Sequence, residues 1–264
     1  MLRHAVTADQ TYSVKTHLLT GVSLILAIFF FAAALLYASV GNAGASSYLA
    51  VMAFFGLPHD EMRATALSLN VLVAAIAAYK FYRAGCFDGR LFWPFALSSI
   101  PFSFLGGSIV LPGTIYRVTV GLVLLYAAYR LFRRAAADDG NEPQNPVSRW
   151  QSLIAGAVMG LIAGLTGVGG GIFLGPLLLF SGWADARRAA GAAAVFNLVN
   201  SLAGLAGQFS IMVSLPATIP IWGLAAGMGG WIGAEYGSRR LGSGRLQQIL
   251  ALILVIAGLR MMFA

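Results

Sequence analysis

The chain has 264 residues, of which 59% are hydrophobic and only 10% are charged, against roughly 25% charged residues in soluble domains. Its mean hydropathy of +0.80 leaves too few polar residues to cover a surface in water. Cys86 is the only cysteine, which excludes both a disulfide-stapled secreted protein and a thiol electron relay. The composition therefore predicts an integral membrane protein.

Ten apolar segments follow one another along the chain. They cover 18–40, 46–57, 64–82, 91–111 and 115–132 in the first half, and 151–166, 172–183, 189–209, 217–236 and 246–263 in the second. A membrane-spanning helix needs about 20 apolar residues, whereas a barrel would show short alternating segments. Residues 22–40 are apolar almost throughout, so we expect an all-α fold.

Polar stretches divide the chain into two membrane regions. Residues 1–17 form a polar N-terminal tail without the pattern of a cleaved signal peptide. Residues 133–149 form a linker that contains three acidic residues and two prolines. We expect membrane repeats at 18–132 and 150–264 on either side of it.

The two regions resemble each other in sequence. A shift of 126 positions without gaps pairs Gly41 with Gly167 and Gly44 with Gly170. The same shift pairs several further punctuating residues: Phe54 with Phe180, Gly56 with Gly182, Leu72 with Leu198, Pro94 with Pro220 and Gly107 with Gly233. This register predicts an internal duplication.

The positions of the basic residues favour ten crossings. If all ten segments cross, 12 of the 17 lysines and arginines share one side, and the other side has only Arg3, Lys15, Arg63, Arg117 and Arg260. If segments 46–57 and 172–183 only re-enter, the split is 10 to 7, so the positive-inside rule favours ten crossings. Five crossings per repeat would make the repeats inverted, with both termini outside and the 133–149 linker cytoplasmic. We expect a multi-pass protein of the cell's inner membrane.

Glycine clusters interrupt one segment in each half. The second half contains Leu165–Gly171, with four glycines in its last five positions, and the first half contains Val40–Ser47. Glycine destabilises a helix by about 1 kcal/mol relative to alanine, so each helix should break inside the membrane. A 12-residue helix of about 18 Å and five extended residues of about 16 Å would together just cover the hydrocarbon.

A helix that begins inside the membrane exposes unpaired backbone N–H groups and the positive end of its dipole. Such donors are costly in hydrocarbon unless they are bonded, and an anion is their natural partner. Two broken helices meeting at the midplane would form a binding site of the kind found in many secondary transporters. The expected site residues are Gly41, Asn42, Gly44, Ser46, Ser47, Thr166, Gly167, Gly169, Gly170 and Gly171.

Asparagines in the apolar runs form a second group of candidates. Asn70, Asn197 and Asn200 lie where an unpaired amide would be costly. Asn197 and Asn200 are three residues apart and share a helix face. Bonding between helices and contact with the substrate both remain open for these residues.

Other features have structural explanations. The glycines repeated at four-residue spacing, namely Gly156, Gly160 and Gly164, Gly223 and Gly227, and Gly229, Gly233 and Gly237, favour close helix packing. Glu235 lies four residues before Arg239, so an ion pair within one helix competes with a role in proton coupling. We expect no cofactor and no metal, because histidine and carboxylate ligands are missing from the apolar runs.

The stretch Gly160–Pro176 reads GLIAGLTGVGGGIFLGP and resembles the glycine-rich motif of the TauE/SafE family of sulfite and organosulfonate exporters. The resemblance extends from about residue 20 to residue 263. It implies a duplicated membrane domain and the transport of sulfur-containing anions such as sulfite and sulfoacetate. The family's second-repeat motif is matched by Gly167, Gly169, Gly170, Gly171 and Pro176, whereas the first repeat departs from the pattern, with Gly41–Ala45 replacing the glycine cluster and Ala50 in place of the usual proline.

The sequence thus predicts a secondary transporter of a small anion that works by alternating access in the lipid bilayer. A non-transporting scaffold protein is the alternative, and an intramembrane enzyme lacks a nucleophile–base pair or metal cluster. The net charge of +8 suits loops that face anionic lipid better than nucleic acid, because the basic residues are scattered over separate loops. The oligomeric state is left open, a homodimer included.

Overall fold

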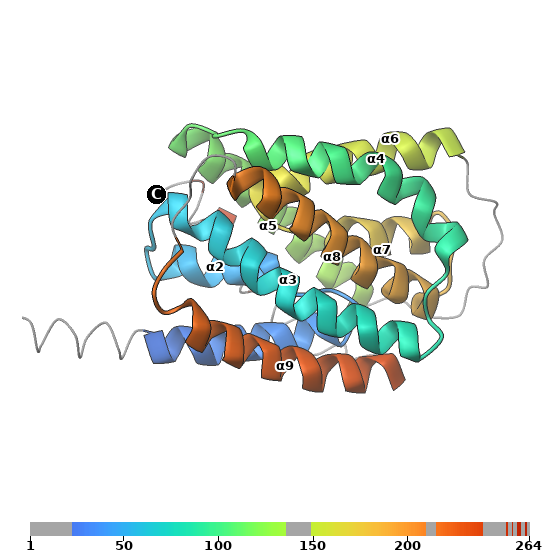
Figure 1. The fold of residues 1–264 in the computed structure, drawn as a ribbon, viewed down its shortest axis with the longest axis horizontal. Helices are drawn as coiled ribbons and strands as arrows, with labels where there is room; N and C mark the ends of the chain where they lie inside the picture. Colours follow the sequence, from blue (N-terminus) through green and yellow to red (C-terminus); the bar gives the residue numbers. More distant parts are fainter. Residues whose placement is uncertain are drawn as a thin grey trace, which may run out of the picture.

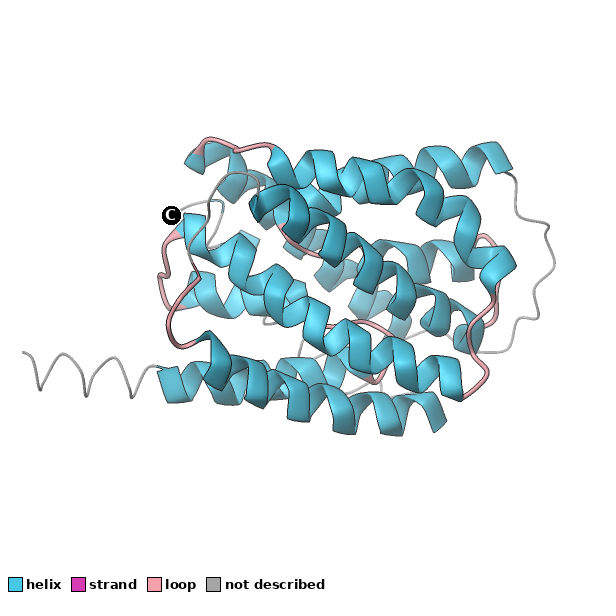
Figure 2. Ribbon diagram, viewed as in Figure 1, coloured by secondary structure: helices cyan, strands magenta, loops and turns pink. Residues whose placement is uncertain are grey.

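The computed structural model describes residues 23–135, 149–209 and 215–239, together with isolated positions near the C-terminus. Within these residues the chain forms helices joined by turns and loops, without strands (Figure 2). The elements in chain order are the helix Ser23–Ala38, α2 (Ala45–Phe54), α3 (His59–Arg83), α4 (Gly89–Ser108), α5 (Gly113–Ala135), α6 (Arg149–Thr166), α7 (Gly171–Phe180), α8 (Ala186–Phe209) and α9 (Ile219–Arg239).

Each of these helices overlaps the apolar segment expected for it, so the all-α prediction is confirmed for the described residues. Helix α5 continues to Ala135 and α6 begins at Arg149, so helices extend into both ends of the expected linker 133–149. The expected tail 1–17, residues 136–148 and most of segment 246–263 lie outside the described residues.

The 126-residue register seen in the sequence also relates local backbone structure. The short helices α2 and α7 have 10 residues each and begin at Ala45 and Gly171, which are 126 positions apart. Glycines with positive φ recur in the same register: 77° at Gly41 and 83° at Gly167, 93° at Gly44 and 84° at Gly170, and 72° at Gly56 and 63° at Gly182. The two halves therefore fold locally in the same way.

The long helices pack in a series across the molecule (Figure 1). Contacts join α6 to α4, α4 to α8, α8 to α3 and α3 to α9, and α9 in turn packs against the helix Ser23–Ala38 through its glycines. In the 126-residue register, the helix Ser23–Ala38 corresponds to α6, α4 corresponds to α9, and α3 corresponds to α8. The order of helices in this series is therefore the same from either end when counterparts are exchanged. Helices α3 and α8 are counterparts of each other, so they lie at the centre of this arrangement.

Closely spaced glycines explain the tightest contacts. Added Cβ atoms on Gly156, Gly160 and Gly164 of α6 would overlap backbone carbonyls of α4. Those on Gly229 and Gly233 of α9 would overlap carbonyls of the helix Ser23–Ala38, and that on Gly237 would overlap the carbonyl of Ser39, just after this helix. The packing interpretation is confirmed for these six glycines. It is wrong for Gly223 and Gly227, because a Cβ added to either would be in ordinary contact with side-chain atoms of Leu72, at 3.8 Å and 3.4 Å.

The outer surface of the helices is strongly apolar. Among the described residues, the two helices Glu61–Arg83 and Ala186–Phe209 are long and apolar enough to cross a membrane by length and composition. Large apolar side chains point outward on other helices as well, including Leu224 with 72% and Ile154 with 64% of its surface exposed. An exposed apolar surface of this extent is unfavourable in water and suits lipid.

We predict that Gly233→Ala destabilises the protein by about 1–3 kcal/mol, because the added methyl group would overlap the carbonyl oxygen of Leu35. Gly223→Ala on the same helix is the matched control, since its Cβ has 3.8 Å of clearance and alanine favours the helix by up to about 1 kcal/mol. Unfolding of the purified protein by a denaturing detergent would measure both. Equal stability of the two variants would contradict the packing explanation.

Candidate functional site

Two non-helical glycine strips lie inside the molecule, as the sequence predicts. The strip before α2 ends in Gly44 and the strip before α7 ends in Gly170, and both glycines are left-handed N-caps with φ of 93° and 84°. Residues with a Cβ adopt this conformation at a cost of roughly 1–2 kcal/mol, which explains glycine at these positions. Residues 40–53 and 166–172 are all buried, so both half-helices begin inside the protein.

Asn70 of α3 and Asn197 of α8 meet between the two strips. The Asn70 Nδ2 group lies 3.0 Å from Asn197 Oδ1 and donates a 2.7 Å hydrogen bond to Ser201 Oγ. Asn70 Oδ1 accepts a 3.1 Å hydrogen bond from the backbone N–H of Ala45, the first residue of α2. A side chain from one long helix thus caps the first half-helix and contacts the other long helix.

The Asn197 amide has two orientations with different backbone partners. In one, its oxygen accepts from Asn70 and, at 3.4 Å, from the N–H of Gly171 at the start of α7. In the other, its nitrogen donates to the Gly169 carbonyl at 2.8 Å and its oxygen accepts from the Ala43 N–H at 3.0 Å, while the same nitrogen lies 3.0 Å from Asn70 Nδ2 in place of the hydrogen bond between the two amides. The second orientation joins the two strips and releases the Gly171 N–H.

Glycine at position 169 allows the amides to reach the strip. A Cβ on Gly169 would overlap the Asn197 and Asn70 side chains and would lie 2.6 Å from Ser201 Oγ. Close approach of polar side chains to the backbone is therefore the local reason for a glycine here.

The predicted polar residues of the first strip are buried but differ in their bonding. Asn42 is 7% exposed, its Oδ1 has no hydrogen-bond partner, and that atom is 2.9 Å from where a Cβ on Gly171 would be. Ser46 and Ser47 are each 1% exposed, and Ser46 donates a 2.9 Å hydrogen bond to the Tyr37 hydroxyl. Asn42 is thus a buried polar group beside the start of the second half-helix.

The side chains of Thr166 and Asn200, two of the predicted site residues, form hydrogen bonds with partners outside the strips. The Thr166 hydroxyl donates to the Ile162 carbonyl of its own helix at 2.7 Å. The Asn200 Nδ2 group donates to Ser99 of α4 at 3.1 Å and to the Phe196 carbonyl at 2.8 Å. The Thr166 bond lies within α6, whereas the bond from Asn200 to Ser99 joins α8 to α4.

Sequence reasoning missed three residues around the strips. Ser201 lies four residues after Asn197 and therefore on the same helix face, a signal that the sequence did contain. Tyr37 had no such signal. Arg63 was counted with the polar loops, but it lies within α3 and is 5% exposed.

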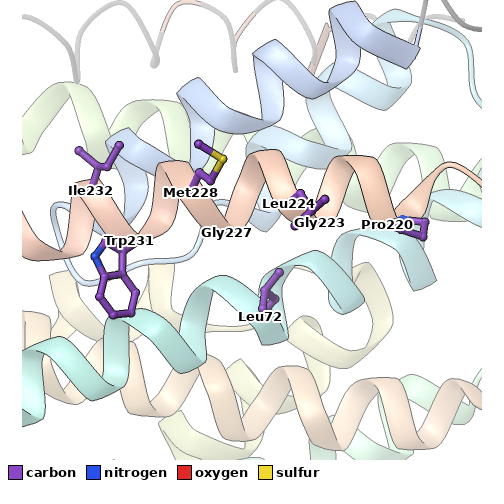
Figure 3. Close-up of a pocket in the computed structure, with 8 residues that line it drawn as sticks. All are labelled: Leu72, Pro220, Gly223, Leu224, Gly227, Met228, Trp231 and Ile232. Atoms are coloured by element: carbon purple, nitrogen blue, oxygen red, sulfur yellow. The ribbon is translucent and has the colours of Figure 1, made fainter.

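Other features lie on the outside of the helices. A groove of about 870 Å³ runs between α3 and α9, and the eight residues that line it, labelled in Figure 3, are apolar apart from the Trp231 ring nitrogen. None of them is a predicted site residue. Glu235 pairs with Arg239 at 2.6 Å, as expected, and also with Lys80 of α3 at 2.5 Å.

A helical protein with an apolar surface and two buried helix starts joined by amides is a membrane protein with an internal polar centre. Residues 25–261 match the family described as sulfite exporter TauE/SafE. The chain is also 42% identical to a probable membrane transporter, y4hK of Sinorhizobium fredii strain NGR234, over 241 residues that cover 90% of this chain and 97% of that protein. No solved structure matches the chain.

The chain therefore belongs to the TauE/SafE family, as the resemblance indicated. The family and the relative identify it as a membrane transporter and not as an enzyme. The same findings favour transport over the scaffold alternative.

We predict that Asn70→Ala and Asn197→Ala are energetically coupled. Each substitution should cost about 1–3 kcal/mol, because it leaves buried groups unpaired, and the double variant should deviate from additivity by about 0.5–2 kcal/mol. Unfolding of the four proteins in detergent would measure this coupling.

The control pair is Asn70→Ala with Gln208→Ala, because Gln208 lies eleven residues beyond Asn197 on α8, about 16 Å along the helix. That pair should be additive within about 0.5 kcal/mol. Additivity in both pairs would mean that the two asparagines do not support each other.

Proposed function

We propose that the protein is a secondary transporter of a small sulfur-containing oxyanion, such as sulfite, sulfoacetate or a related organosulfonate. The anion binds where the starts of α2 and α7 face each other. The observation that carries this proposal is the convergence of two buried helix starts on one pair of asparagine amides.

The amide oxygens mark the positions of the substrate oxygens. Asn70 Oδ1 accepts from the Ala45 N–H, and Asn197 Oδ1 accepts from the Gly171 or the Ala43 N–H. An oxyanion can replace a neutral amide oxygen at such donors, because the positive ends of two helix dipoles favour negative charge. Rotation of each amide would then present its NH₂ group to the anion.

The glycines and the small polar residues complete the proposed site. Gly41, Gly44, Gly167, Gly169 and Gly170 hold the strips in conformations with positive φ. Asn42, Ser46, Ser47 and Thr166 belong to the proposed set as short polar side chains in or beside the strips. Asn42 Oδ1 and Ser47 Oγ have no hydrogen-bond partner, and Asn42 is the foremost of the two because its Oδ1 lies beside Gly171 at the start of α7. We assign Asn200 to the support of α4 instead of the substrate.

We further propose that the repeats are inverted. Gly191 near the start of α8 packs against Cys86, just after the end of α3. At the opposite end, Arg63 near the start of α3 donates a hydrogen bond to the Gly107 carbonyl of α4. Gly107 also packs against Gly204, near the end of α8, so the start of α3 lies near the end of α8. The counterparts α3 and α8 thus run in opposite directions, as counterparts related by an axis in the membrane plane must.

We propose that alternating access occurs by rocking of one repeat against the other, around the site between the two strips. We place the ends of α3 and α9, where Lys80, Arg83 and Arg239 lie, on the cytoplasmic side of the inner membrane. The linker after α5 is then cytoplasmic as well, and residues 18–132 and 150–264 are the two repeats.

The substrate proposal predicts selective stabilisation by ligand. Sulfite, sulfate, thiosulfate, sulfoacetate, methanesulfonate, taurine and acetate would be tested on the detergent-purified protein at constant ionic strength. A ligand that binds only the folded state stabilises it by about 2.7 kcal/mol at 100 times its Kd, which should raise Tm with concentration for a sulfur oxyanion but not for acetate. If no anion raises Tm up to millimolar concentration, the proposed function is wrong.

Two asparagine variants locate the binding site. Asn42→Ala should weaken binding of the effective anion by roughly tenfold, the value of one hydrogen bond to a charged group, without loss of stability. Asn200→Ala should lower stability by about 1–3 kcal/mol and leave the Kd within a factor of about three, a difference below 1 kcal/mol. The reverse pattern would place the substrate at α4 and α8 and not at the strips.

A further inference from the structure

Arg63 is a positive charge inside the protein without an ion pair. It lies one turn into α3 and is 5% exposed. Among the described residues, the salt bridges join Lys80 to Glu235, Arg188 to Asp185 and Arg239 to Glu235, and Arg63 takes part in none of them. A buried charge without a countercharge is costly, so its presence calls for an explanation.

The guanidinium is held by backbone carbonyls at the end of α4. Its NH2 group donates to Gly106 and Gly107 at 2.6 Å each, and its NH1 group donates to Ile109 at 2.9 Å. A cation at the C-terminal end of a helix dipole is favourable. These neutral acceptors fix the group in place, but they leave its net charge of +1 intact. The Nε atom is buried and has no partner.

Arg63 also lies against the second glycine strip. A Cβ on Gly167 would be 3.1 Å from Arg63 Cγ and 3.2 Å from its backbone oxygen. Asn70 is seven residues further along α3, which is two turns and about 10 Å on the same face. Arg63 and Asn70, whose amide caps α2, thus lie on the same face of α3.

The corresponding place in the other half has no charge. Gly41, the counterpart of Gly167, packs against the backbone of Ala190 in α8. The duplicated architecture therefore carries the cation at only one of its two equivalent positions. Capping the C-terminal end of α4 explains the hydrogen bonds of the Arg63 guanidinium, but it does not explain why Arg63 also lies against Gly167.

We propose that Arg63 is the charge-selecting residue of the transport path: its guanidinium, which has no ion pair and is carried on a side chain whose Cγ lies beside Gly167, favours substrates that carry negative charge over neutral molecules of the same shape. This proposal rests on the proposed function, because it concerns the same strips. The charge raises the local concentration of anions at the strip and stabilises the bound anion through its electrostatic field. The ligand class is a sulfonate or a sulfite-like oxyanion with at least one full negative charge.

The test compares two ligands of nearly equal shape, methanesulfonate, which is an anion, and dimethyl sulfone, which is neutral. Both would be titrated into the full-length protein in detergent at constant ionic strength, with the wild type, Arg63→Gln, Arg63→Lys and Arg83→Gln. Arg83 is an exposed cation at the other end of α3, so Arg83→Gln removes the same charge away from the strips.

In the wild type and in Arg83→Gln, methanesulfonate should bind at least about tenfold more tightly than dimethyl sulfone. In Arg63→Gln the affinity for methanesulfonate should fall by roughly tenfold or more, with the affinity for dimethyl sulfone unchanged. Arg63→Lys keeps the charge but not the planar fork, so its Tm should fall while its preference for the anion persists. This variant also tests the proposal if Arg63→Gln does not fold.

A residue that only caps α4 would change Tm in both variants and leave the ratio of the two affinities as in the wild type. That result, or loss of the preference in folded Arg63→Lys, would overturn the role of Arg63 while the proposed function stands. If no anion binds the wild type, both proposals fail together.

Discussion

The hydrogen bonds of Asn70 and Asn197 are the contacts on which the centre of the structure depends. A helix that begins in apolar surroundings leaves backbone N–H groups that must find acceptors. Here the acceptors come from the two central helices, with Asn70 capping α2 and Asn197 reaching both strips. The broken helices, the glycines around them and the contact of α3 with α8 all follow from the need to satisfy these groups.

Glycine serves three distinct physical purposes in this chain. Gly44 and Gly170 permit left-handed caps, and Gly169 leaves room for the two amides to approach the backbone. The glycines that face α4 and the helix Ser23–Ala38 instead permit backbone-to-backbone contact between long helices. In membranes such contact contributes much of the attraction between helices, because lipid removes the hydrophobic driving force. One residue type thus provides both the polar centre and the packing that surrounds it.

The features that sequence predicted are those encoded locally or by the repeat. The helices, the broken strips and the pairing of the two halves follow from hydropathy, glycine density and a constant register. Contacts between segments that are distant in the chain could not be predicted from the sequence. Asn200 finds Ser99 about a hundred positions away, and nothing in the sequence distinguished it from Asn197. Arg63 directly precedes an apolar run, so the sequence placed it in a loop. Its acceptors belong to α4, and the sequence does not show that α4 lies beside it.

The same register that relates the halves also shows where they have diverged. Asn42 and Ala43 of the first strip correspond to Val168 and Gly169 of the second. Arg63, which lies against Gly167, corresponds to Ala189, and the residue that lies against Gly41 is Ala190. A site with perfect two-fold symmetry would bind an asymmetric substrate in two equivalent orientations. Here the amide side chain of Asn42 belongs to the first strip, and Arg63 lies against Gly167 of the second. For the anion proposed to bind here, these differences would favour one orientation, with the negatively charged group toward Gly167. On this proposal, selection among small anions depends on where the duplicated halves differ, whereas the shared architecture provides the frame.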